Sequence, residues 1–66
     1  MNITLNGTQK VFPSAHTLSQ LLADLQLPPE TIVVELNTLI IQPDCYSETT
    51  LSEGDTVEII RFVGGG

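Results

Sequence analysis

The chain has 66 residues, of which 41% are hydrophobic, and its two strong cations face eight carboxylates, giving a formal charge of −6. A core this small argues against an enzyme that encloses its substrate, because an enclosed pocket would hollow the core out. The acidity argues against nucleic-acid binding, since attraction to phosphates needs clustered lysine and arginine. The negative charge favours a partner with a basic face, although solubility alone also accounts for it.

The first twelve residues have the pattern of a hairpin. Residues 3–5 alternate between apolar and polar, and Asn6-Gly7 is a dipeptide that favours a two-residue turn with positive φ. Residues 9–12 are then expected to return antiparallel. Because Pro13 cannot donate a hydrogen bond to a sheet, it is expected to end the second strand at a sheet edge.

A short helix is predicted next. Thr17 and Gln20 have the spacing of a capping box, in which each residue satisfies a free backbone N–H of the first turn. Pro28-Pro29 ends the helix, because the residue before a proline is pushed out of the α region. The helix carries one apolar stripe at i, i+3, i+4 and i+7: Leu18, Leu21, Leu22 and Leu25.

The second half of the chain is predicted to be mostly strand. Residues 32–36 are a β-branched run, Asn37-Thr38 is a tight turn, and residues 39–41 form a further strand. Residues 44–51 have no period and are expected to form a turn or a short 3₁₀ segment along a sheet edge. After a turn at residues 53–55, residues 56–63 form the last and longest strand.

One helix can cover only one face of a sheet, so this element order predicts the α+β class. We expect a β-grasp fold, in which a mixed sheet of four to five strands wraps around one helix, with the first and last strands parallel neighbours. The period of each element predicts the core: Ile3, Leu5, Phe12, Leu18, Leu21, Leu22, Leu25, Val34, Leu36, Val57 and Ile59.

The whole chain resembles the ThiS and MoaD sulfur carriers. The likeness rests on the strand running into Asn6-Gly7, the helix start at Thr17-Leu18, residues 51–55 before the last strand, and the tail Val63-Gly64-Gly65-Gly66. Gly-Gly directly after the last strand of a ubiquitin-sized domain is its specific part, and the length favours ThiS. A third glycine departs from the family pattern, as does Lys10 at a usually apolar position, which suggests that Lys10 lies near the sheet margin.

The resemblance implies a β-grasp domain at residues 1–63, a flexible glycine tail at residues 64–66, and a protein co-substrate of other enzymes rather than an enzyme. An E1-like adenylating enzyme of the ThiF type would use ATP to adenylate Gly66. A persulfide from a sulfur donor, such as a cysteine desulfurase, would displace AMP and leave a covalent thiocarboxylate at Gly66, with no bound cofactor or metal. A thiazole synthase of the ThiG type would accept this sulfur in thiamin biosynthesis.

Glycine suits these steps, because it has no Cβ to obstruct attack at the Gly66 carbonyl, and three extended residues reach ~10 Å into a partner. Two other functions also fit the sequence. One is a MoaD-like carrier for molybdopterin or another acceptor, and the other is a ubiquitin-like binding module with an inert tail.

The last strand is the expected docking site for these partners. If Val57 and Ile59 point inward, Ile60 and Phe62 point to the face that the helix does not cover, and an exposed apolar patch of this kind marks a partner surface. The alternative is that residues 44–51 or a local bulge partly covers them. The docking residues are therefore predicted to be Ile60, Arg61, Phe62 and Val63, with Arg61 setting the register.

Cys45 and His16 are the two other residues whose side chains could take part in chemistry. Cys45 has acidic surroundings and no nearby base, so we expect it to be dispensable for sulfur transfer. His16 has no metal-ligand spacing and is expected to be a solvated loop residue. A lone cysteine and the absence of an export signal or a long apolar stretch predict a cytoplasmic protein without a membrane partner.

Overall fold

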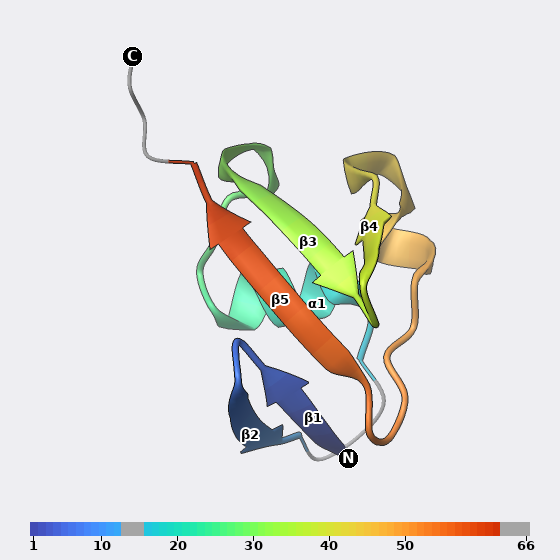
Figure 1. Cartoon of the computed structure of the whole chain (residues 1–66). Helices are drawn as coiled ribbons and strands as arrows, with labels where there is room; N and C mark the ends of the chain where they lie inside the picture. Colours follow the sequence, from blue (N-terminus) through green and yellow to red (C-terminus); the bar gives the residue numbers. More distant parts are fainter. Residues whose placement is uncertain (13–15, 63–66) are drawn as a thin grey trace.

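The computed structural model describes residues 1–12 and 16–62 (Figure 1). The described elements, in chain order, are β1 (Asn2–Leu5), β2 (Thr8–Val11), α1 (Leu18–Asp24), the 3₁₀ helix η1 (Pro29–Thr31), β3 (Ile32–Leu36), β4 (Leu39–Ile41), the 3₁₀ helix η2 (Pro43–Glu48) and β5 (Thr56–Arg61).

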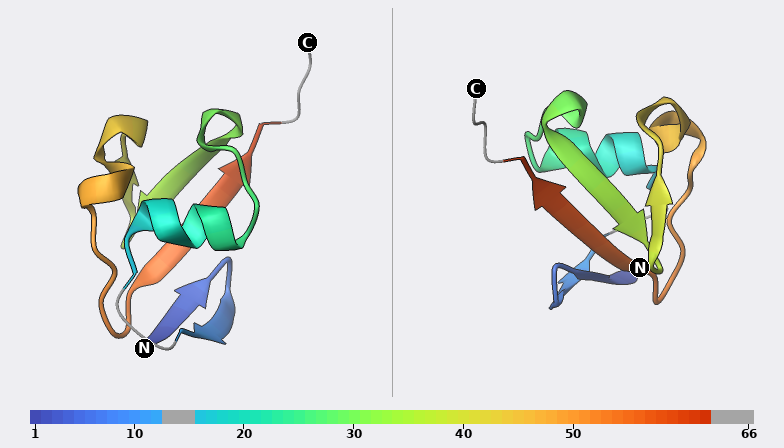
Figure 2. Two further views of the ribbon diagram at one scale, coloured as in Figure 1. Left: turned by 180° about the vertical axis from the view of Figure 1, so that it is seen from behind. Right: turned by 45° about the horizontal axis from the view of Figure 1, so that its top comes forward.

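The strands form one mixed sheet of five strands in the order β2-β1-β5-β3-β4. β1 pairs in parallel with β5, and the other neighbouring strands are antiparallel. The helix crosses one face of this sheet, and none of the described elements lies on the opposite face of β5 and β3 (Figures 1 and 2). The predicted β-grasp fold and the parallel contact between the first and last strands are therefore confirmed.

Both predicted tight turns have the left-handed backbone that two-residue hairpins require. Asn6 and Gly7 have φ of 49° and 81°, and Asn37 and Thr38 have φ of 49° and 74°. The predicted 3₁₀ segment is η2. The last strand is shorter than predicted, since β5 ends at Arg61 rather than at residue 63.

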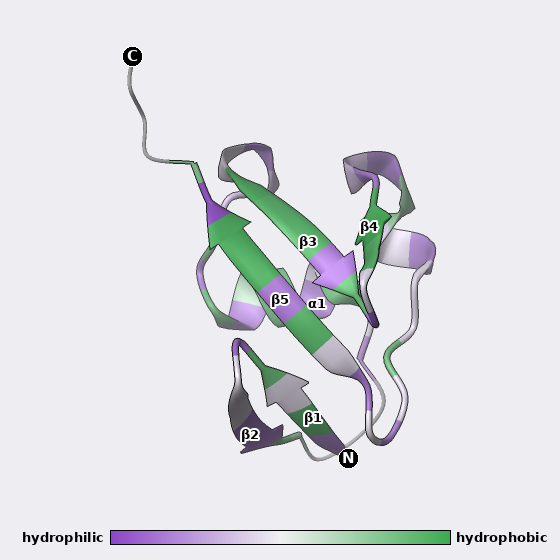
Figure 3. Ribbon diagram, in the orientation of Figure 1, coloured by the Kyte–Doolittle hydropathy of each residue, from purple (hydrophilic) through white to green (hydrophobic). Residues whose placement is uncertain are grey.

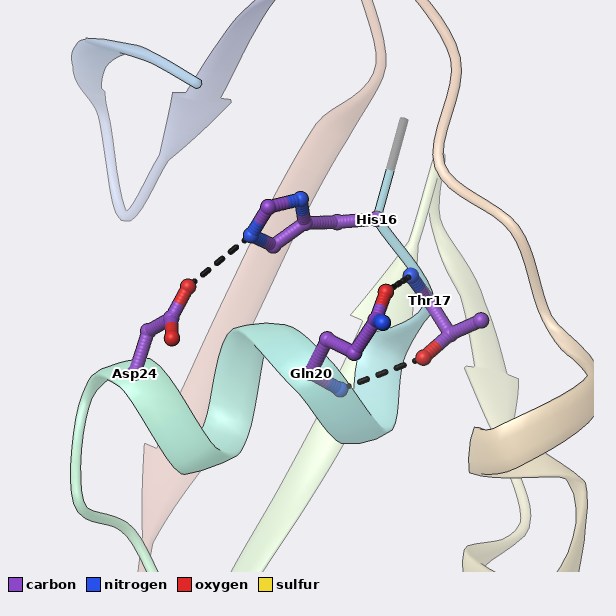
Figure 4. A network of polar contacts seen from close by, with 4 residues as sticks. All are labelled: His16, Thr17, Gln20 and Asp24. Carbon is purple, nitrogen blue, oxygen red and sulfur yellow. Dashed lines mark hydrogen bonds and ion pairs between the residues drawn. The ribbon is translucent and has the colours of Figure 1, made fainter. Parts of the chain in front are cut away.

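The predicted capping box at the start of α1 is confirmed (Figure 4). The Gln20 backbone N–H donates to Thr17 Oγ1 at 3.1 Å, and the Thr17 N–H donates to Gln20 Oε1 at 2.8 Å. The prediction that Leu25 lies in the core is wrong, because Leu25 is 37% exposed. Leu25 is the C-cap, and the chain turns away at Gln26, which has a positive φ.

The core lies between α1 and the inner face of the sheet. Its members are Ile3, Leu5, Leu18, Leu21, Leu22, Ile32, Val34, Tyr46, Leu51 and Val57. Of the predicted core residues, Phe12, Leu36 and Ile59 are only partly buried against it. Ile32, Tyr46 and Leu51 were missed. Tyr46 and Leu51 come from the segment without a period. Two backbone hydrogen bonds hold this segment against the start of the helix, one from Leu18 N–H to Thr49 O and one from Leu51 N–H to His16 O.

Lys10 lies on β2, the edge strand, directly opposite Ile3, and its residue is exposed. Its expected place at the sheet margin is confirmed. The prediction for Pro13 lies outside the described residues.

Candidate functional site

The candidate site lies where β5 reaches the end of the sheet. β5 is held against β3 from Val57 to Arg61, and the Phe62 backbone N–H donates to Thr31 O at 3.0 Å. The sheet therefore fixes the position of Phe62, the last described residue. The predicted site residues Val63, Gly64, Gly65 and Gly66 lie outside the described residues.

The outer face of the sheet beside this point is apolar and open. Strand alternation places Ile60 and Phe62 on the side opposite to the buried Val57, and Val33 lies directly across from Ile60. Ile60 is 49% exposed and Phe62 is 59% exposed. The expectation that these two side chains face solvent is confirmed, and the unbroken register from Val57 to Arg61 contains no bulge. Phe62 lines one groove together with Tyr46 of residues 44–51, which leaves most of the Phe62 residue exposed.

An open groove of ≈ 340 Å³ adjoins this face at the end of the sheet where β3 begins. η1 and η2 border it on either side, and Phe62 forms part of its wall. Its apolar lining includes Pro29, Ile32, Ile40, Pro43, Tyr46 and Phe62. Because the groove is largely apolar, it suits an apolar side chain of a partner rather than a charged substrate.

Two carboxylates lie farther along the same outer face. Glu35 and Glu58 are directly opposite each other on β3 and β5 and make no salt bridge with a described residue. Like charges that face each other across strands destabilise a sheet. Figure 3 shows the pair as a polar band next to the apolar end of β5 and β3. A partner that presents a basic group here would relieve the repulsion.

Sequence reasoning located the contribution of β5 to this face but missed that of its neighbours. Val33 and Glu35 alternate with the buried Ile32 and Val34, so the period of two along β3 was the available signal. Arg61 is exposed and makes no salt bridge with a described residue, so its expected role in setting the register stays a prediction.

The other candidate residues lie apart from this site or have structural roles. Cys45 is exposed on η2, on the far side of β3 from the end of β5 (Figure 1). The expectation of a solvated His16 is wrong, because its side chain is only 16% exposed. His16 Nε2 lies 2.9 Å from Asp24 Oδ2 (Figure 4), and its ring centroid is 5.2 Å from that of Phe12.

Burial raises the pKa of the Tyr46 phenol above its ordinary value. Nowhere in the described part of the chain do three or more His, Cys, Asp or Glu side chains gather in a way that could hold a metal ion. No helix among the described elements is long and apolar enough to cross a membrane.

Comparison with known proteins gives a consistent result. The family model described as "ThiS family" matches residues 2–66. The Sulfur carrier protein ThiS of Bacillus subtilis is 44% identical over 65 residues, which cover 97% of this chain and 98% of that protein. The crystal structure of the thiamine biosynthesis protein (ThiS) of Geobacter metallireducens superposes with a TM-score of 0.87 at 33% identity, covering 100% of both chains.

Longer proteins match as well. The thiazole synthases of Paramagnetospirillum magneticum and Magnetococcus marinus are 32% and 36% identical over 66 residues, which is 100% of this chain. The chain spans only 20% of the length of these curated relatives.

Proposed function

Because this chain belongs to the ThiS family, we propose that it is a sulfur carrier of thiamine biosynthesis and that the carboxylate of Gly66 carries the sulfur. The observation that supports this most strongly is the match of the family model over residues 2–66, which includes the glycine tail. The fold supports it too, because β5 is paired with β3 up to Arg61, three residues before the first of these glycines in the sequence.

The proposed chemistry begins with activation, because a carboxylate has a pKa of about 3.5 and is a poor acyl electrophile at neutral pH. A partner enzyme joins the Gly66 carboxylate to the α-phosphate of ATP and releases pyrophosphate. A persulfide of the sulfur donor then attacks the carbonyl carbon, and AMP leaves. A second thiol cleaves the S–S bond of the resulting acyl disulfide, which releases the thiocarboxylate and a new disulfide.

We further propose the partners. An E1-like enzyme of the ThiF type performs the adenylation, a cysteine desulfurase supplies the persulfide, and a thiazole synthase of the ThiG type accepts the sulfur. The likeness of the whole chain to a segment of two thiazole synthases supports this acceptor over a molybdopterin precursor. The chain itself acts as a co-substrate, and its lone Cys45 suits the reducing conditions of the cytoplasm.

Docking on the outer face of β5 would direct the tail into the partner. Phe62 and Ile60 supply exposed apolar area, with Arg61 and Val63 beside them in the sequence. The globular body would stay outside the partner while the glycines, free of side chains, enter its active site.

Variants of the tail test the proposal. Deleting Gly66 shortens the reach by ~3.4 Å, and a misplacement of this size can cost about a hundredfold or more in rate. Adding one residue after Gly66 should have the same effect, because it removes the free carboxylate, whereas Gly64→Ala should be milder. The readout is the rate of thiocarboxylate formation, with a thermal unfolding curve as the control for folding. A binding module with an inert tail would form no thiocarboxylate, either as the parent chain or in any of the three variants.

A further inference from the structure

The backbone of β5 uses its two edges in alternation. Its even-numbered residues bond to the β3 side, as the bonds from Phe62 N–H to Thr31 O and from Asn37 N–H to Thr56 O show. The backbone N–H and C=O groups of its odd-numbered residues therefore point to the β1 side. The bond from Asn6 N–H to Val57 O at 2.9 Å agrees with this alternation.

β1 is too short to cover that second edge. It pairs with β5 only at Thr56 and Val57, and then the chain turns away at Asn6-Gly7. The Ile59 backbone N–H donates to the Asn6 side-chain Oδ1 at 2.7 Å, so a side chain extends the hydrogen-bond ladder between β1 and β5 by one step.

Beyond that step the edge has no partner strand among the described residues. The Ile59 carbonyl and the Arg61 N–H and carbonyl point to the side without a strand, and none of them makes a hydrogen bond with residues 1–12 or 16–62. Figure 1 shows β3 on one side of the upper half of β5 and no strand on the other. An open stretch of this kind, which we call the β5 edge (residues 59–61), is a template for another strand.

We infer that an extended segment of the activating enzyme adds to the β5 edge as a further strand of the sheet. This inference rests on the proposed function and specifies how the partner of that function holds the chain. Added strands derive affinity from main-chain hydrogen bonds and specificity from alternate side chains. The Ile60 and Phe62 side chains flank the β5 edge on the outer face, so the added segment should place apolar side chains there.

This arrangement would solve a problem of the glycine tail. Glycines offer a partner no side chains, so the direction in which the tail enters must be set by the backbone before it. Gly66 follows Arg61 by five residues, a reach of about 17 Å when extended. A strand paired with the β5 edge would fix the start of this reach through the backbone.

Amide-to-ester replacement tests the inference, since chemical synthesis of a 66-residue chain allows single backbone N–H groups to be removed. Replacing the Ile60–Arg61 amide by an ester removes the Arg61 N–H and leaves every side chain in place. Affinity for the activating enzyme should fall roughly threefold to tenfold, the effect of one lost hydrogen bond. Hydrogen exchange at the Arg61 amide of the unmodified chain should be fast when free and slow in the complex.

The matched control is the same change in the Lys10–Val11 amide of β2, the edge strand at the other end of the sheet. The bond from Phe12 N–H to Met1 O shows that β2 bonds to β1 through its even-numbered residues, so the Val11 N–H points to the open edge of β2. Both esters remove an open-edge N–H and weaken one carbonyl within a ladder. The ester at Val11 should leave the affinity unchanged.

Equal affinities for the unmodified chain and the Arg61 ester would overturn the inference, as would an Arg61 amide that still exchanges fast in the complex. If the unmodified chain nevertheless gains sulfur, the sulfur-carrier function stands while the inference fails. If the unmodified chain neither binds nor gains sulfur, both fail. Protection of Arg61 in the free chain that grows with concentration would assign the edge to a second copy, which also contradicts the inference.

Discussion

Glu53 is a carboxylate that ties the turn before β5 to the start of β1. Its side chain accepts hydrogen bonds from the Asn2 backbone N–H at 2.9 Å and from Asn2 Nδ2 at 3.0 Å. These bonds hold the pKa of Glu53 below its ordinary value. Since the folded pKa is depressed, this contribution to stability is present above the pKa of an unfolded glutamate and is lost as the pH falls through the folded value.

We therefore expect Glu53→Gln to flatten the acid side of the stability profile. The free energy of unfolding, measured in urea between neutral pH and the acid range below the ordinary glutamate pKa, should fall less steeply in the variant. Glu48→Gln is the control, because it removes an equal charge from a side chain without a hydrogen bond to a described residue. If both variants keep the slope of the parent chain, the Asn2 contacts do not stabilise the fold in the way described.

Phe62 is the residue that should anchor a partner. It is 59% exposed, so Phe62→Ala should leave the unfolding transition nearly unchanged. Aromatic anchors contribute about 2 kcal/mol or more to an interface, so affinity for the activating enzyme should fall roughly thirtyfold. Val11→Ala is the matched control, because Val11 is 74% exposed on β2 at the other end of the sheet (Figure 1). An equal loss in both variants, or none in either, would place the interface elsewhere.

At the scale of elements, the turn between β3 and β4 contains a strained residue. Thr38 is β-branched and has a φ of 74°, a region that such residues strongly avoid. The turn is held by its neighbour, because Asn37 Nδ2 donates to Asp55 Oδ1 at 3.0 Å and the Thr56 N–H donates to Asn37 Oδ1 at 2.9 Å. The position of Thr38 is therefore imposed by the sheet.

We expect Thr38→Gly to raise the free energy of unfolding by about 0.5–1 kcal/mol, because glycine adopts this backbone without a steric penalty. Gly7→Ala is the converse test. Gly7 has a φ of 81° and a Cβ there would meet no atom within 4 Å, so its cost of about 1 kcal/mol should come from the backbone alone. Denaturant unfolding measures both, and a less stable Thr38→Gly variant would show that the threonine is not strained.

The elements also show which features a sequence can predict. The turns at Asn6-Gly7 and Asn37-Thr38 and the capping box at Thr17 were correct, because each depends on residues within one short segment. Tyr46 and Leu51 were missed as core residues, because only tertiary packing buries a segment without a period. Leu25 was misplaced because the helix stripe says nothing of where the helix ends.

The same limit applies to the site. Alternation along one strand was enough to predict the exposure of Ile60 and Phe62. The period of two along β3 was enough to place Val33 and Glu35 on one face of their own strand. Their position beside Ile60 and Glu58, and the open edge of β5, depend on how strands pair, which no local pattern specifies. The roles of Gly64, Gly65 and Gly66 come from family likeness and stay predictions.

At the scale of the whole molecule, the sheet acts as a platform with one covered face and one open face. α1 and the core fill the inner side, while the outer side of β5 and β3 offers apolar and acidic groups beside the start of the tail (Figure 3). The net charge of −6 would speed encounter with a basic partner at low salt. In the proposed function, the body of the protein would serve to position the tail.

The intact mass of the chain after reaction tests this account most directly. The chain is incubated with ATP, its cognate activating enzyme and a sulfur donor. The account predicts that the mass rises by the difference between one sulfur and one oxygen, localised to the peptide that contains Gly66, and that Cys45→Ser gains the same mass. An unchanged mass, under conditions in which the same enzyme modifies a control carrier, would contradict the account.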